Sequence, residues 1–147
     1  MTGRPDSAPQ AVLAYGLLGI IPFCSLPIAA LLAPNCTSVA AAIEAVYAAL
    51  ILSFLGGARW GLAVRDASPN PVVVGLAMTP TLAGLAVLVV THGDVRLQLL
   101  ALAAALTLSW IWDLTARSLP PWYGRFRTVL TLGAVGGLCV GAMQVPQ

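Results

Sequence analysis

The chain has 147 residues, of which 59% are hydrophobic and only 8% are charged. A soluble domain carries about 25% charged residues, so the composition excludes a soluble globular protein. The formal net charge is only +2, and the basic residues, all arginines, are scattered along the chain. Nucleic-acid binding needs a clustered basic face and is therefore not expected. The length predicts a single domain, residues 1–147, that lies almost wholly in lipid.

Five apolar segments are long enough to cross a bilayer, because a membrane helix needs about 20 apolar residues for ~30 Å of hydrocarbon. The expected spans are residues 11–33, 39–64, 72–91, 95–116 and 128–143. The segment before the last span contains the pair Pro120–Pro121 and is expected to be a loop, because proline interrupts a helix. The predicted fold class is an all-α polytopic membrane bundle of five transmembrane helices.

The arginines predict the orientation. With a cytoplasmic N-terminus, the inside carries most of them: Arg4, Arg59, Arg65, Arg117, Arg125 and Arg127. The outside carries only Arg96, which agrees with the positive-inside rule. Four tryptophans fall near the same interface: Trp60, Trp110, Trp112 and Trp122. We therefore expect the N-terminus in the cytoplasm and the C-terminus outside.

The second expected span contains a distinctive motif, which runs from Tyr47 to Gly61. This stretch resembles a motif of the family called domain of unknown function 3429, which comprises small inner-membrane proteins similar to transmembrane protein 69. The motif of that family is similar to Tyr-Gly-Ala-x-Ile-Leu-Ser-Phe-Leu-Gly-Gly-Val-Arg-Trp-Gly. The matching residues are Tyr47, Ile51, Leu52, Ser53, Phe54, Leu55, Gly56, Gly57, Arg59, Trp60 and Gly61. The chain departs from that motif at Ala48 and Ala58.

Two further pieces are similar to the same family: residues 19–23, and residues 119–131, where Phe126 replaces the more usual leucine. The resemblance covers nearly the whole chain and implies an inner membrane of bacteria or mitochondria. The arginine-only, alanine-rich composition favours a bacterial inner membrane. The resemblance brings no established activity and no catalytic residues.

Small residues occur at helical spacing in two spans. They are Ser53, Gly56, Gly57 and Gly61 in the second span, and Gly133, Gly137 and Gly141 in the fifth. Close backbone approach at small residues holds membrane helices together. These faces either pack the protein's own bundle or, for the stripe from Gly133 to Gly141, contact another membrane protein or a second copy.

Arg59 and Asp113 lie about one turn inside the cytoplasmic ends of the second and fourth spans. Charged residues within a membrane usually face the bundle interior and pair, so we expect an intramembrane ion pair between them. Two alternatives remain. Asp113 could pair with Arg117 four residues later on its own helix, and Arg59 could extend to the lipid phosphates.

Glu44 lies near the other end of the second span, ~22 Å along the helix axis from Arg59. At 100° per residue the two are only ~60° apart around the helix, so both can face one internal seam. The alternative is that Glu44 reaches the outer interface or pairs with Arg96. The gap along the seam is almost wholly apolar, without the acids and histidines that a proton path needs.

The interfacial segment before the fifth span combines prolines, aromatic residues and arginines: Pro120, Pro121, Trp122, Tyr123, Arg125 and Arg127. Such a segment either anchors the protein at an anionic leaflet or offers a docking surface to a partner. Cys24, Cys36 and Cys139 form no C-x-x-C pair and are interpreted as small apolar residues, with a redox role as the alternative.

No metal site or cofactor is expected, because zinc needs three or four protein ligands and the chain has one histidine, His92. No nucleophile and base converge in sequence, so no catalytic residues and no enzymatic activity are predicted. The leading hypothesis is a non-enzymatic accessory or assembly factor in the lipid bilayer that binds another membrane protein. The alternative is a small transporter or channel that uses the polar seam near Arg59 and Asp113.

Overall fold

The computed structural model describes residues 8–115 and 120–146, and every regular element among them is helical. The first half holds α1 (Gln10–Leu18), α2 (Ile21–Leu32), the 3-10 turn η1 (Pro34–Cys36) and α3 (Thr37–Ala63). The second half holds α4 (Pro71–Leu76), α5 (Thr79–Val90), α6 (Val95–Leu114) and α7 (Pro121–Gln144). These elements combine into five segments that are long and apolar enough to cross a membrane, as predicted.

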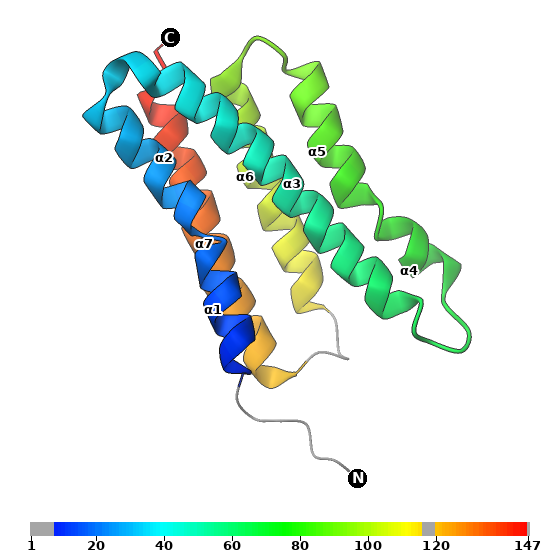
Figure 1. Ribbon diagram of the computed structural model, residues 1–147. Helices are drawn as coiled ribbons and strands as arrows, with labels where there is room; N and C mark the ends of the chain where they lie inside the picture. Colours follow the sequence, from blue (N-terminus) through cyan, green and yellow to red (C-terminus); the bar gives the residue numbers. More distant parts are fainter. Residues whose placement is uncertain (1–7, 116–119, 147) are drawn as a thin grey trace.

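Three of the five segments are composite: α1 with α2, η1 with α3, and α4 with α5. Successive segments run in opposite directions, and the start of α1 and the end of α7 lie at opposite ends of the molecule (Figure 1). We call the end at which α1 begins the Arg59 end and the other the Glu44 end, after the charged residue of α3 nearest to each.

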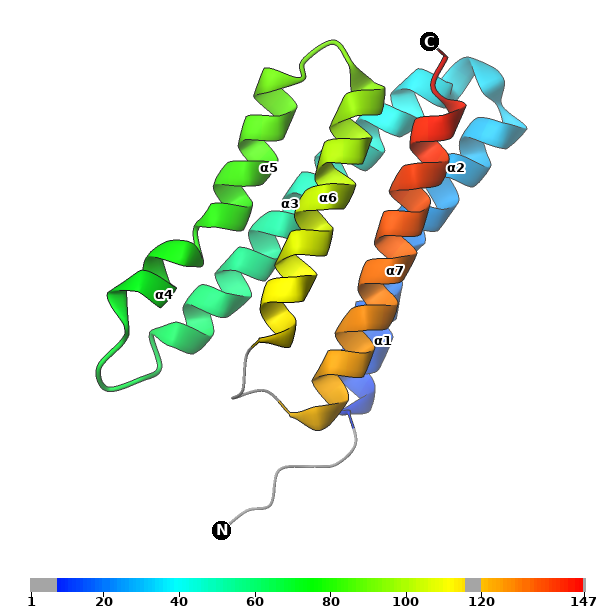
Figure 2. The same ribbon diagram turned by 180° about the vertical axis from the view of Figure 1, so that it is seen from behind.

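Spans one, two, four and five form a ring of four helices, in which α2 contacts α3, α3 contacts α6, α6 contacts α7 and α7 contacts α2. The third span lies outside this ring, where α5 packs on α3 and α6 (Figures 1 and 2). Among the described residues, the fully buried large side chains come from the ring helices and include Phe23, Leu52, Leu99, Leu102 and Leu106. The centre of the bundle is therefore apolar and tightly packed.

Prolines explain the break between α1 and α2 in the first span and the break between α4 and α5 in the third span. Pro22 and Pro80 each occupy the first turn of the second helix, where the missing N–H would have no helical partner anyway. At the first break the Tyr47 hydroxyl of α3 donates a hydrogen bond of 2.9 Å to the Gly19 carbonyl. A hydrogen bond from a neighbouring helix thus supports the backbone where the first span is interrupted.

The fifth span begins earlier than predicted, which corrects the expectation of a loop through residues 120–127. Pro121 is the first residue of α7, and the helix continues through Trp122 and Arg127. Proline at the first helical position is favoured, because its fixed backbone angle suits the helix and the missing donor costs nothing there. Pro120 precedes the helix in an extended conformation.

Candidate functional site

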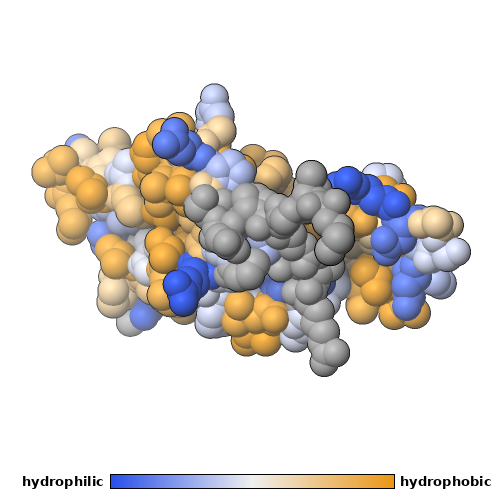
Figure 3. All heavy atoms as spheres, turned by 90° about the horizontal axis from the view of Figure 1, so that it is seen from below, coloured by the Kyte–Doolittle hydropathy of each residue, from blue (hydrophilic) through white to orange (hydrophobic). Residues whose placement is uncertain are grey.

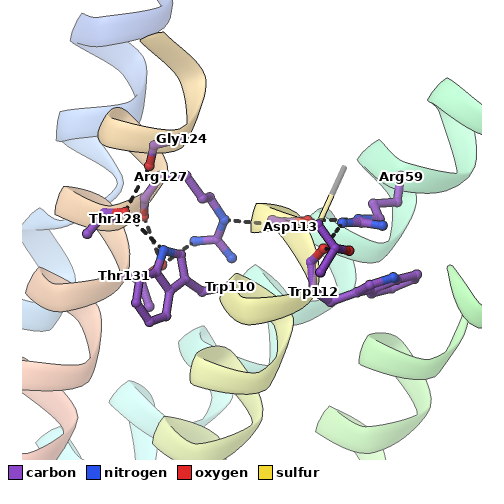
Figure 4. Close-up of polar contacts among 9 residues, drawn as sticks. Arg59, Trp110, Trp112, Asp113, Gly124, Arg127, Thr128 and Thr131 are labelled. Atoms are coloured by element: carbon purple, nitrogen blue, oxygen red, sulfur yellow. Dashed lines mark hydrogen bonds and ion pairs between the residues drawn. The ribbon is translucent and has the colours of Figure 1, made fainter. Parts of the chain in front are cut away.

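Asp113 is the centre of an ion cluster at the Arg59 end of the bundle. It lies in the last turn of α6, and only 6% of its side chain is exposed. Arg59 of α3 donates from Nε to Asp113 Oδ1 over 2.8 Å, and Arg127 of α7 donates from Nε to Oδ2 over 2.8 Å. One carboxylate therefore joins three helices of the ring and is bonded through both oxygens (Figure 4).

The Arg59 guanidinium makes two further contacts with α6. Its Nη2 donates to the Trp112 carbonyl over 2.6 Å, and its central carbon lies 3.9 Å from the centre of the Trp112 ring. A guanidinium over an indole face is favourable, more so when it is shielded from water. The Trp112 indole thus covers one face of the Arg59 guanidinium, and Asp113 and the Trp112 carbonyl bind one edge of it. Arg59 therefore folds back onto α6 and does not extend away from the bundle.

Arg127 is the most deeply buried charged group of the cluster, with 5% of its side chain exposed. Its Nη1 donates over 2.7 Å to the Thr131 hydroxyl, which in turn donates to the Arg127 carbonyl. Its Nη2 is buried and has no hydrogen-bond partner in the part of the chain that the structure describes. Two arginines share one aspartate, so the cluster carries a formal charge of +1.

A second polar contact joins α6 and α7 beside the ion cluster. The Trp110 indole donates over 3.0 Å to the Thr128 hydroxyl, and that hydroxyl donates to the Gly124 carbonyl one turn earlier in α7 (Figure 4). Together with Arg127 and Thr131, these residues give the first half of α7 a polar face toward α6.

A cleft of about 670 Å³ opens beside the ion cluster at the same end of the molecule. The charged and aromatic residues that line it are Arg59, Arg65, Asp66, Trp112, Asp113 and Tyr123. Seen from this end, hydrophilic residues interrupt a largely hydrophobic surface (Figure 3). Between Arg59 and the Glu44 end, the buried side chains of Leu52, Leu102 and Leu106 fill the core of the bundle.

Glu44 lies in the interior near the opposite end, with 1% of the residue exposed. It neither reaches the outer interface nor forms an ion pair with Arg96 within the described chain, in contrast to the alternative considered from sequence. Its Oε2 contacts Gly141 of α7, and its Oε1 has no hydrogen-bond partner there. The space around it is too small for a water molecule.

Glu44 and Arg59 do not form the continuous polar seam proposed from their helical spacing. On α3 the buried residues between them are Ala45, Ala48, Leu52 and Gly56, which pack in the core or against α5. The apolar residues that the sequence already placed between the two charged groups thus pack in the core and separate them.

The glycine stripe of α7 packs inside the protein's own bundle. A side chain at Gly133 would meet Ile20, one at Gly137 would meet the Phe23 backbone, and one at Gly141 would meet Glu44. The Phe23 carbonyl loses its usual helical donor, because Pro27 follows four residues later, and it faces Gly137 instead. This face is therefore not free to bind another protein or a second copy, which corrects that alternative.

The small residues of α3 divide into two groups. Ser53 accepts a hydrogen bond of 3.3 Å from Thr81, and Gly56 lies against the Ala77 carbonyl, so both pack on the third span. At Gly57 and Gly61, by contrast, a side chain would meet nothing within 4 Å. These two glycines face away from the bundle.

The interfacial segment of the sequence is mostly absorbed into the bundle. Phe126 packs on Gly16 of α1, Tyr123 lines the cleft, and Arg127 belongs to the ion cluster. Arg125 is exposed. Sequence reasoning placed Arg127 at the membrane surface and missed its role, although its spacing of four residues from Thr131 puts both on one helical face.

Arg117, the other partner considered for Asp113, lies outside the described residues, as does Arg4. The three cysteines are free thiols, exposed at Cys24 and Cys36 and half-buried at Cys139.

Comparison with known proteins agrees with the membrane architecture. The chain matches the family described as "Protein of unknown function (DUF3429)" over residues 8–143. It is 34% identical to transmembrane protein 69 of Xenopus tropicalis over 139 residues, which are 92% of this chain and 54% of that protein. It is 36% identical to transmembrane protein 69 of Mus musculus over 78 residues, 51% of this chain and 32% of the relative.

The chain thus spans about half the length of the frog protein and about a third of the mouse protein in these alignments. No solved structure matches the chain. The family match covers all five spans, the motif on α3 and the ion cluster, and so this multi-pass membrane protein belongs to the DUF3429 family, which is related to transmembrane protein 69.

Proposed function

We propose that the protein is a non-enzymatic accessory factor that binds a transmembrane helix of another membrane protein along the outer face of α3. Its location would be a bacterial inner membrane, with the Arg59 end in the cytoplasm. The positive-inside rule supports this orientation, because Arg59, Arg65, Arg125 and Arg127 lie toward that end and Arg96 begins α6 at the other.

The observation that carries the proposal is the pair of outward-facing glycines, Gly57 and Gly61. Together with Phe54 and Ala58 they follow the spacing i, i+3, i+4 and i+7, which defines one face of a helix. Phe54 is 70% exposed, and a side chain at either glycine would meet nothing. Small residues four apart let the backbone of a second helix approach closely, where van der Waals packing stabilises association in lipid.

The same face continues toward the Glu44 end as an apolar groove of about 560 Å³. Val39, Ile43, Val46 and Leu50 line this groove, and each of them is more than one third exposed. A groove followed by a flat glycine surface along one helix suits an apolar helix better than a single small molecule.

The test is photo-cross-linking in native membranes, with a benzophenone amino acid incorporated at Phe54. We expect one discrete protein adduct that Gly57→Leu abolishes and Gly136→Leu preserves, since Gly136 on α7 also faces open space. The same probe at Leu132, which is 64% exposed on α7, serves as the positional control. Adducts with lipid only, with a second copy, or equally at both positions would contradict the proposal.

A second candidate function, transport of a small solute, is favoured by one observation, the cleft that reaches Arg59 and Asp113. The packed leucines beyond the cleft count against it, because a solute would have to displace Leu52, Leu102 and Leu106. Solute passage would be tested in proteoliposomes by measuring proton or ion leak with Asp113→Asn as the comparison. Leak equal to that of empty vesicles would reject this candidate.

A further inference from the structure

We propose that the cleft at the Arg59 end binds an anionic phospholipid, with its phosphate at Arg59 and Arg65 and an acyl chain along the apolar wall between α3 and α4. This site adjoins the docking face of α3 and shares Ala58 with it, but Phe54, Gly57 and Gly61 are not among the residues that line the cleft. The two proposals therefore stand or fall separately.

The first argument is the charge of the ion cluster. Arg59 and Arg127 share the single carboxylate of Asp113, and none of the three side chains is more than 15% exposed. Asp66 offsets Arg65 on the rim of the cleft, so a formal charge of +1 remains among these five residues. A charge shielded from water is costly unless a counter-charge compensates it, and an anion in the adjacent cleft would do so.

The second argument is the set of donors left available. Arg59 uses Nε for Asp113 and Nη2 for the Trp112 carbonyl, and no acceptor in the described chain bonds its Nη1. Arg65 is exposed on the same wall of the cleft, and the Tyr123 side chain lines it too. Guanidinium groups bind phosphate oxygens with strong, charge-assisted hydrogen bonds.

The third argument separates a lipid from a water-soluble anion. Leu62 and Ala63 of α3 and Val73 and Leu76 of α4 line the cleft together with the charged residues. Leu62, Val73 and Leu76 are 48%, 40% and 45% exposed, so the apolar wall is open on its outer side. A ligand with a phosphate at one end and a hydrocarbon chain at the other satisfies both parts of this lining.

The experiment is native mass spectrometry of the full chain in mild detergent, titrated with phosphatidylglycerol or phosphatidylcholine. We expect preferential retention of phosphatidylglycerol. Arg65→Gln should weaken it about fivefold, the effect of one arginine near an anionic surface. Arg125→Gln removes the same charge from an exposed position on α7 outside the cleft and should leave retention unchanged. Arg59→Gln should weaken it more, but Arg65→Gln decides the question if that variant misfolds.

Equal retention of the two lipids, or an equal loss in Arg65→Gln and Arg125→Gln, would overturn the proposal. Two soluble compounds, added in competition with phosphatidylglycerol, test for other classes of ligand in the cleft. Displacement of phosphatidylglycerol by inorganic phosphate at equal concentration would show a site for free phosphate and not for lipid. Displacement by a soluble polyglutamate peptide would assign the cleft to an acidic protein segment. The proposal is supported if neither compound displaces phosphatidylglycerol and the protein retains phosphatidylglycerol in preference to phosphatidylcholine.

Discussion

The bundle contains two buried acids that are handled in opposite ways. Asp113 at one end is bonded through both oxygens to arginines from two other helices, and a cleft opens beside it. Glu44 near the other end is fully buried, contacts a glycine, and has an oxygen with no partner in the described chain. Asp113 thus connects three helices through ion pairs, whereas the Glu44 side chain occupies the space that the absence of a side chain at Gly141 of α7 leaves.

This difference explains why the two ends differ in accessibility. The ion cluster leaves charged groups and an aromatic face along an open cleft, so it can interact with ligands. The surroundings of Glu44 leave no room for water, and Gly141 and Leu99 pack closely there. Substitutions at the two acids are therefore expected to differ strongly in their effect on stability.

The largest effect is expected from Asp113→Ala. It leaves Arg59 and Arg127 without their shared partner, and removal of one member of a buried ion cluster costs about 3–5 kcal/mol. The folded fraction after heating, measured by size-exclusion chromatography in mild detergent, should fall sharply. Asp66→Ala at an exposed position is the control and should change little. Equal stability of the two variants would show that the cluster does not hold the helices together.

Gly137→Ala should have the next largest effect. The new methyl group would meet the backbone of Phe23, which can yield only if α2 and α7 move apart. Overpacking of this kind costs about 1–3 kcal/mol. Gly136→Ala is the matched control on the neighbouring residue, where a methyl group meets nothing. The same heating assay should separate the two variants, and equal melting would contradict the packing described for α2 and α7.

Tyr47→Phe should have a smaller effect, since it removes only the hydrogen bond to the Gly19 carbonyl at the break in the first span. Side-chain hydrogen bonds in membrane proteins contribute about 0.6 kcal/mol on average and up to about 1.7. Tyr15→Phe is the control, because Tyr15 is 76% exposed. A loss in the control as large as in Tyr47→Phe would show that the bond adds nothing.

Much of the architecture could be predicted from sequence, because hydropathy directly reflects the length of the apolar segments. The first, third and fourth spans begin within one residue of their predicted starts, and α3 begins two residues before the start predicted for the second span. The start of α7 was missed because the pair Pro120–Pro121 was interpreted as a helix breaker over the whole segment. The position of Pro121 at the first turn of a helix could not be distinguished locally from a loop.

The site was partly predictable for a related reason. Arg59 and Asp113 could be placed together, because charged groups at the same depth in a membrane tend to pair. Arg127 was assigned to the surface, and only the tertiary packing of α7 on α6 brings it to Asp113. Likewise the four-residue period of Gly133, Gly137 and Gly141 predicts a packing face but cannot say which helix covers it.

The smallest effect is expected from Glu44→Gln, and it tests the comparison between the two acids most directly. The amide keeps the shape that fits beside Gly141 and removes a charge that faces no described cation. We therefore expect stability equal to or slightly above that of the native chain, because a neutral group of the same shape lowers the cost of burying an unpaired charge. A loss as large as that of Asp113→Ala would mean that Glu44 also has a charged partner, and the contrast between the two ends would fail.

Glu44→Ala combined with Gly141→Ala extends the test, because the shortened side chain at position 44 makes room for the new methyl group at position 141. The double variant should be more stable than the sum of the two single losses predicts, and strict additivity would show that Glu44 does not press on α7 at this position.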